Sequence, residues 1–241
     1  MKLVSEHSSS WSHLSFAGFT YSSLLAWSKG DALPQSDRPK VTELAVNLKE
    51  AIDALLKEAR ESQDAIIFTR PAAQAAQSAA LGVLAHRIKE ALVTVQQKVG
   101  NNAPDHPIVR RFLPELLGTI SKLPIADRPQ EAMRAAARLK DLDVFDGRDE
   151  IAARLEASAT AANDAIEGAS AAYDGWRGER SEEVVAKGKL RLALEKTHRL
   201  LGAQFAGQRS LVESFFLRAG NLGDANDPGD AGDVPTDAPQ S

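Results

Sequence analysis

Hydrophobic residues recur at alternating spacings of three and four positions in four stretches of the chain, a pattern typical of amphipathic α-helices. The stretches are 41–66, 81–99, 151–176 and 190–215. The last of them has a seam of large apolar side chains with a few polar interruptions: Leu190, Leu194, Thr197, Leu201, Phe205, Gln208, Val212 and Phe215. We predict one long helix for each stretch, since no strand pattern of comparable quality occurs in the sequence.

Proline marks the positions at which helices begin. Four times a short polar residue stands two positions before a proline: Asp37-Arg38-Pro39, Thr69-Arg70-Pro71, Asp105-His106-Pro107 and Asp127-Arg128-Pro129. The polar side chain can accept hydrogen bonds from first-turn amides, and proline removes no helical hydrogen bond in that turn. Acidic residues favour two further starts, at 146–149 and 181–183. Six helices are therefore predicted, with helix ends at Gly100 and near Gly175 and Gly178.

These helices predict an all-α fold, an elongated antiparallel four-helix bundle built from two long helical hairpins joined by a short-helix connector. Two hairpins packed together can bury apolar stripes that neither could bury alone. Whether Pro71 marks a tight turn or a kink stays open. Five segments follow in order: an aromatic and serine-rich N-terminal segment (1–36), a first helical hairpin (37–100), a Pro-rich helical connector (101–146), a second helical hairpin (147–219) and a disordered acidic tail (220–241).

Alanine accounts for about 40 of the 241 residues and is concentrated at 72–80 and 152–172. Alanine is the best helix former, and its small side chain lets coiled-coil partners approach closely. Each buried alanine removes little apolar area from water, so these seams stabilise the fold weakly. Either large side chains elsewhere compensate, or a partner covers these faces.

Composition also narrows the function classes. The absence of cysteine excludes a disulfide scaffold, a thiolate zinc site and a cysteine nucleophile. No apolar run approaches the 18 or so residues of an integral membrane span. The tail at 220–241 carries five Asp and no Lys or Arg, which leaves 28 acids against 29 bases elsewhere and no bias toward nucleic acid. Because the first segment lacks the continuous apolar core of a signal peptide, we expect a cytoplasmic protein.

The best metal-ligand candidate is the pair Glu195 and His198, an E-x-x-H on the fourth long helix. A di-iron bundle needs a second such pair, but Val83 stands where His86 would require its glutamate. Two Asp-rich stretches match a calcium-binding loop only in part, and no phosphate-binding glycine loop or nucleophile motif occurs. We therefore expect no metal, no cofactor and no enzyme activity.

The fourth long helix also carries charged and polar residues of interest. A basic run there consists of Lys187, Lys189, Arg191, Lys196 and Arg199. At 100° per residue these side chains spread around most of the helix, which favours a solvated surface over a nucleic-acid site. Three polar residues lie on or near the buried seam: Thr197, Gln204 and Gln208. We interpret them as fixing helix register, with a ligand pocket inside the bundle as the alternative.

The N-terminal segment holds five of the thirteen aromatic residues, and these are our candidate partner-binding residues: Trp11, Phe16, Phe19, Tyr21 and Trp27. Their spacing fits a helix and a strand equally well. Aromatic side chains are common anchors of protein interfaces. The alternatives are that the segment folds back onto the bundle or lies on a lipid surface.

Long amphipathic helices without a catalytic constellation predict a non-enzymatic helical scaffold or adaptor. It would act through protein–protein interaction, with a protein partner, or through self-association as a homo-oligomer. The alternative is an amphipathic helical protein that coats a lipid or storage-granule surface, so peripheral lipid contact stays open.

Overall fold

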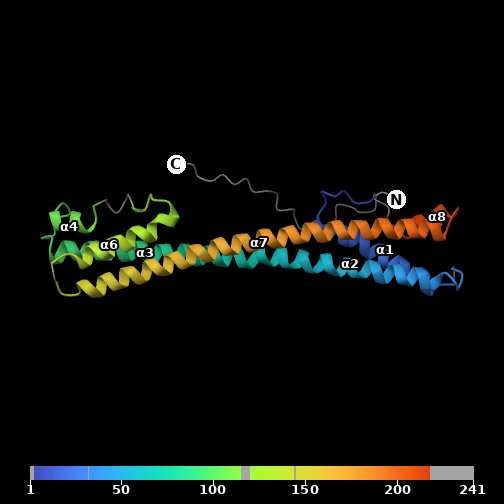
Figure 1. Cartoon of the computed structure of the whole chain (residues 1–241), viewed down its shortest axis with the longest axis horizontal. Helices are drawn as coiled ribbons and strands as arrows, with labels where there is room; N and C mark the ends of the chain where they lie inside the picture. The colour runs from blue at the N-terminus through green and yellow to red at the C-terminus, as the bar shows by residue number, and fades with distance from the viewer. Residues whose placement is uncertain (1–2, 32, 115–119, 144, 218–241) are drawn as a thin grey trace. The chain divides into compact units, whose positions relative to one another are not determined.

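A computed structural model describes residues 3–31, 33–114, 120–143 and 145–217 of the chain. These residues form helices and no strand, which confirms the predicted all-α helical bundle (Figure 1). The α-helices are α1 (Ser10–Lys29), α2 (Arg38–Asp64), α3 (Arg70–Lys98), α4 (Pro107–Phe112), α6 (Arg128–Lys140), α7 (Arg148–Gln204) and α8 (Arg209–Ser214). Two short helices of other types are the π-helix η1 (Ala65–Thr69) and the 3-10 helix η2 (Ile125–Asp127).

At Pro71, where a tight turn and a kink were both open, the structure has no loop. Instead of a loop near Pro71, the five residues of η1 connect α2 directly to α3 (Figure 1). Proline lacks an N–H group, and its ring clashes with the carbonyl four residues earlier, here that of Ile67. A π-helical turn widens the backbone where α-helical bonding fails. Pro71 therefore interrupts the α-helical hydrogen-bond ladder without a loop, and the first hairpin (37–100) is corrected to a helical path without a loop.

The second predicted reversal, near Gly175 and Gly178, is also absent. α7 continues for 57 residues through both glycines and through the start expected at 181–183. Glycine lowers helix stability by about 1 kcal/mol relative to alanine, which a helix of strong formers tolerates. A glycine ends a helix only when it adopts a left-handed backbone, and neither of these two has a positive φ. The second hairpin (147–219) is therefore corrected to a single long helix followed by α8.

The real ends of the long helices do carry left-handed residues. After α3, Asn101 and Asn102 have φ of 49° and 60°. Before α7, Gly147 has φ of 86°, and Gly207 between α7 and α8 has φ of 83°. Asparagine and glycine tolerate this conformation best. The helix end predicted at Gly100 is confirmed, and the four α-helices marked by proline begin where expected. At Thr69 and Asp127 the predicted capping hydrogen bond is absent, and α3 continues directly from η1.

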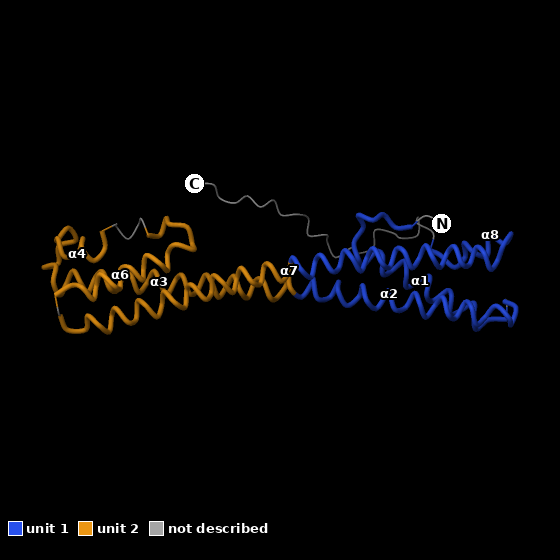
Figure 2. Tube along the Cα trace, viewed as in Figure 1, with its two compact units in different colours: residues 1–64, 177–241 blue, residues 65–176 orange. Residues whose placement is uncertain are grey.

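The chain divides into two compact units (Figure 2). Unit 1 comprises residues 1–64 and 177–241, and unit 2 comprises residues 65–176. Unit 1 combines two stretches that lie far apart in the sequence, whereas unit 2 is one continuous stretch, and each unit has a hydrophobic core of its own. The acidic tail, predicted to be disordered, lies outside the described residues.

The core of unit 1 is built from the seams of α1, α2 and α7. Its fully buried large side chains include Phe16, Leu24, Leu48, Leu55, Leu190, Leu194, Leu201 and Phe215. Full burial of one such side chain contributes roughly 1.5–3 kcal/mol. α1 packs along α2 in this unit, so the aromatic segment is a helix that folds back onto its own bundle.

The core of unit 2 uses smaller side chains. Leu84, Ile88 and Val95 of α3 pack in one cluster with Phe112 of α4 and Leu155 of α7. α6 adds a buried face that is mostly alanine: Ala132, Ala135, Ala136 and Leu139. Small side chains at a helix contact permit a close approach of the helix axes. In this unit, large side chains of α3, α4 and α7 compensate for the alanine seam.

Candidate functional site

The five aromatic residues proposed to bind a partner divide into buried and exposed ones. Phe16 is completely buried, and the ring of Trp27 lies 5.6 Å from that of Phe215. Tyr21 is half-buried, whereas Trp11 and Phe19 are 36% and 41% exposed. Phe16 and Trp27 are accounted for by packing within unit 1. Only Trp11 and Phe19 offer much apolar surface to a partner.

Polar contacts fix the start of α1 on α7. The Ser10 hydroxyl donates to Glu183 Oε1 at 2.5 Å, and Arg180 Nη1 donates to the other carboxylate oxygen at 3.0 Å. Further along α7, Lys187 donates to the Ser8 carbonyl at 3.2 Å and Arg191 to the Val4 carbonyl at 2.6 Å. Two members of the predicted basic run are thus used inside unit 1 to hold the N-terminal segment.

His13 lies in this interface with 1% of its surface exposed. Its Nδ1 lies 3.0 Å from the Ser9 carbonyl and donates to it, which leaves Nε2 buried without a hydrogen-bond partner among the described residues. Burial lowers the pKa of His13 below 6.5, and the nearby charges of Lys187 and Arg191 lower it further. A neutral imidazole is therefore the form that fits this site.

Acidification is expected to destabilise unit 1 through His13. In the unfolded chain His13 has an ordinary pKa near 6.5, so the unfolded state binds more protons below that pH and the free energy of unfolding falls as pH falls. The contribution of His13 to the free energy of unfolding is fully present above pH 6.5 and is lost as pH drops toward the lower folded-state pKa. In denaturant titrations between pH 7.5 and 5, the free energy of unfolding should fall less in His13→Gln than in the native protein. Equal losses in both proteins would contradict this account.

Glu195 and His198, the best metal-ligand candidates of the sequence, each have another contact. Glu195 forms an ion pair with Arg199 at 3.2 Å. The imidazole of His198 meets the ring of Phe216 edge-on at 5.3 Å between centroids. Neither residue belongs to the single cluster of metal-type ligands found within the described residues.

That cluster consists of Glu58 and Glu61 of α2 and Glu179 of α7. The sequence carries no signal for this cluster, because Glu179 is brought near α2 only by the fold. Lys57 already lies 3.2 Å from Glu58 and 3.3 Å from Glu61, and both carboxylates raise the pKa of Lys57. The cluster is thus partly neutralised by a cation of the protein itself.

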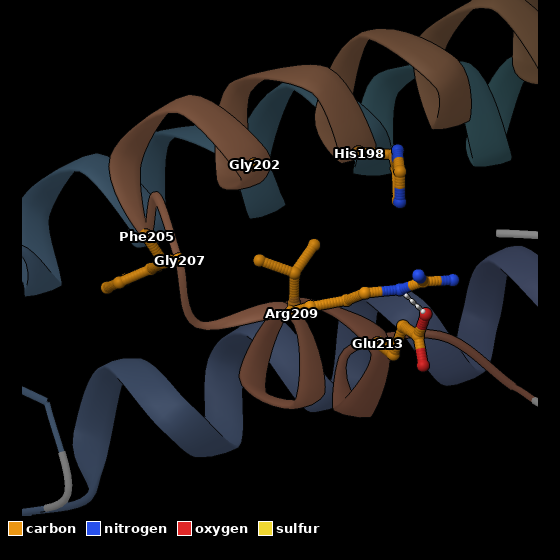
Figure 3. A pocket seen from close by; sticks show the side chains of 7 residues that line it. His198, Gly202, Phe205, Gly207, Arg209 and Glu213 are labelled. Atoms are coloured by element: carbon orange, nitrogen blue, oxygen red, sulfur yellow. Dashed lines mark hydrogen bonds and ion pairs between the residues drawn. The ribbon is translucent and has the colours of Figure 1, made fainter.

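A cavity of about 320 Å³ lies between the end of α7 and α8 in unit 1 (Figure 3). His198 and Gly202 of α7 face Arg209 and Glu213 of α8 across it. Arg209 Nε donates to Glu213 Oε1 at 2.7 Å, so these opposite charges compensate each other at the cavity wall. Burial lowers the pKa of His198. The cavity therefore offers a neutral imidazole and an internal ion pair.

The polar residues of the α7 seam have separate roles. Thr197 is buried, and its hydroxyl donates to the Ala193 carbonyl of its own helix at 2.8 Å. Gln204 Nε2 donates to Asp37 Oδ1 at 2.5 Å, and its Oε1 accepts from Lys40 at 3.2 Å. Gln204 thus links the end of α7 to the start of α2, as the register interpretation expects.

The most exposed apolar surface of unit 2 lies on η1. Ile66, Ile67 and Phe68 are 41%, 49% and 65% exposed, although Ile66 was expected in the buried seam. Ala65 takes the buried position instead. The sequence signal for this surface is the run of three large apolar residues shortly before Pro71, of which the helical period placed only Ile66 in the seam.

Arg70 next to η1 is held by aromatic rings. Its guanidinium lies 4.4 Å from the centroid of Trp176 and 5.3 Å from that of Tyr173. Cation–π contacts of this kind stabilise by about 0.5–2 kcal/mol. They hold the backbone in place at the junction of η1 and α3. The apolar triplet therefore lies next to an ordered stretch of backbone.

Comparison with protein families, curated proteins and solved structures finds no match to this chain. Within the described residues, no helix is both long and apolar enough to cross a membrane.

Proposed function

We propose that this protein is a non-enzymatic helical scaffold or adaptor that works through protein–protein contact, including self-association. The observation that carries the proposal is the exposed triplet Ile66, Ile67 and Phe68 on η1. Exposed apolar residues gathered in one patch mark interaction sites more often than isolated ones do. π-Helical turns are also frequent at functional sites.

The free energy that the triplet can contribute to binding follows from the exposed area of its side chains. Complete burial of an Ile or Phe side chain is worth about 1.5–3 kcal/mol, and these three retain between 41% and 65% of their exposure. Covering them in an interface would contribute about 3 kcal/mol, or roughly 100-fold in a dissociation constant. The triplet can therefore be the centre of an interface, with surrounding side chains supplying the rest.

The test is sedimentation velocity of the native protein and of the double variant Ile67→Ser with Phe68→Ser. We expect the native protein to associate and the variant to dissociate at least about 10-fold more readily, because the serines no longer gain from leaving water. The matched control is Val46→Ser, which removes an exposed aliphatic side chain (54% exposed) from α2. A native protein that stays monomeric and captures no partner from a native lysate would contradict the proposal.

The lipid-coat alternative is favoured by one observation on α1. Its only Asp, Glu, Lys or Arg residue is Lys29, in the last turn, and Trp11 and Phe19 are exposed. Interfacial helices insert such apolar and aromatic side chains into the headgroup region. Flotation with phospholipid vesicles distinguishes the two functions, since the scaffold proposal predicts that the protein stays in the dense fraction.

A further inference from the structure

One outward face of α7 combines cations with exposed aliphatic side chains. Val185, Lys189, Leu192, Lys196 and Arg199 follow each other at spacings of four and three, and fall within about 80° of arc at 100° per residue. All five are exposed, with Leu192 at 66% and Val185 at 54%. We call this set the α7 outer face. It lies entirely in unit 1.

The charge of this face is not balanced within the described residues. Lys49 and Lys57 of α2 pair with acidic residues of their own helix. Lys189 and Lys196 form no ion pair with any described residue, and Arg199 pairs with Glu195 alone. The face itself has three Lys or Arg and no Asp or Glu, a charge of +3, and Glu195 is the acidic residue next to it in the sequence of α7.

The sequence beyond the described residues carries the opposite charge. Residues 220–241 contain five Asp and no Lys or Arg, a charge of −5. This segment is the most acidic part of the chain, and it contains no basic side chain that would compete for its own carboxylates. Charge alone therefore makes it the best complement of the α7 outer face within the molecule.

The chain also leaves the described part of the structure at the level of this face along α7. Phe216, one residue before the described part ends at position 217, contacts His198, which lies between Lys196 and Arg199 in the sequence of α7. The outer face extends about 21 Å along the helix, at 1.5 Å per residue. Twenty residues can span up to roughly 66 Å. The acidic segment can therefore reach every cation of the face in the same molecule.

We propose that residues 220–241 bind the α7 outer face of their own chain. Exposed ion pairs are individually weak, but tethering raises the effective concentration of the segment to the millimolar range, so several weak pairs acting together suffice. Salt weakens the contact, because the Debye length falls to about 3 Å at 1 M. This intramolecular contact is independent of the proposed interface on η1.

The test is zero-length carbodiimide crosslinking of the full chain at low concentration, followed by trypsin digestion and mass spectrometry. The reagent joins a carboxylate to an amine only where the two are in contact. Trypsin releases the whole acidic segment as one peptide, because the last basic residue is Arg218. We expect this peptide joined to Lys189 or Lys196, with a yield at least 5-fold lower in 1 M NaCl.

Two variants and two reference lysines keep the test specific. Lys189→Gln with Lys196→Gln, and Asn at all five tail Asp positions, should each abolish the crosslink without altering the helical circular dichroism. The exposed Lys89 and Lys98 of α3 report random encounters. Equal yields at these lysines, or no tail crosslink at all, would overturn the proposal. So would crosslinks that join isotopically labelled to unlabelled chains, since the occupant would then be a second copy.

Discussion

Replacing Gly175 with proline is expected to destabilise the protein by about 3 kcal/mol or more. Gly175 lies inside α7, far from either end of that helix. Proline there removes one helical hydrogen bond and places its ring against the carbonyl of Ala171. A chain that turned at this glycine, as the sequence pattern suggested, would accept proline at little cost. Chemical denaturation monitored by circular dichroism measures the difference.

The control is Gly175→Ala at the same position. A Cβ built on Gly175 meets no other atom within 4 Å, so alanine adds no clash. Because alanine favours the helix over glycine, this variant should gain about 0.5–1 kcal/mol. A small effect of proline, or a loss with alanine, would indicate a turn or loop at this position.

Replacing Phe215 with alanine is expected to cost about 3–5 kcal/mol. Phe215 is completely buried, and its ring lies 5.6 Å from that of Trp27 and 6.3 Å from that of Phe205. Truncation leaves a cavity between α1, α7 and α8 that these neighbouring rings cannot fill. Thermal and denaturant unfolding measure the loss, which should appear as a lower midpoint with a similar denaturant dependence.

Phe19→Ala provides the matched comparison, because it removes the same ring from a site that is 41% exposed. Its cost should be well below that of Phe215→Ala, since a ring with that exposure has less burial to lose. Equal costs for the two variants would mean that the cluster around Phe215 is not the core of unit 1.

Helix starts and the all-α class could be predicted from local chemistry. The proline of the pattern places four α-helix starts correctly, because proline fits the first turn of a helix whatever lies around it. The predicted side-chain caps are not observed at Thr69 and Asp127, which make no capping hydrogen bond. Buried positions such as Leu190, Leu194 and Leu201 also follow from the helical period. These properties are determined within a few turns of one helix.

The chain reversals could not be predicted in the same way. Glycine and proline are both common at helix ends. Whether a helix actually ends at Gly175 or Pro71 depends on what the chain packs against. Local signals identify the residues at which a helix can end with little loss of free energy. At several of these residues the helix nevertheless continues. The turns at Asn101–Asn102 and Gly147 are the ones where left-handed backbone is actually adopted.

The candidate sites show the same limit. Trp11 and Phe16 are five residues apart on α1, yet one is exposed and the other is completely buried. Composition identified the aromatic segment but not the side of the helix that meets α2. Ile66 was assigned to the buried seam because the π-helical turn before Pro71 was not foreseen. Neighbouring helices, rather than residue type, decide which apolar side chains remain available.

The central claim is that the apolar triplet on η1 is a contact surface for another protein chain. A photo-crosslinking benzoylphenylalanine placed at position 68 tests it most directly, with position 46 as the exposed reference. We predict a covalent adduct to a second copy or to one defined partner from position 68, in far higher yield than from position 46. Irradiated protein that stays monomeric and without adduct from position 68, or that reacts equally from both positions, would contradict the claim.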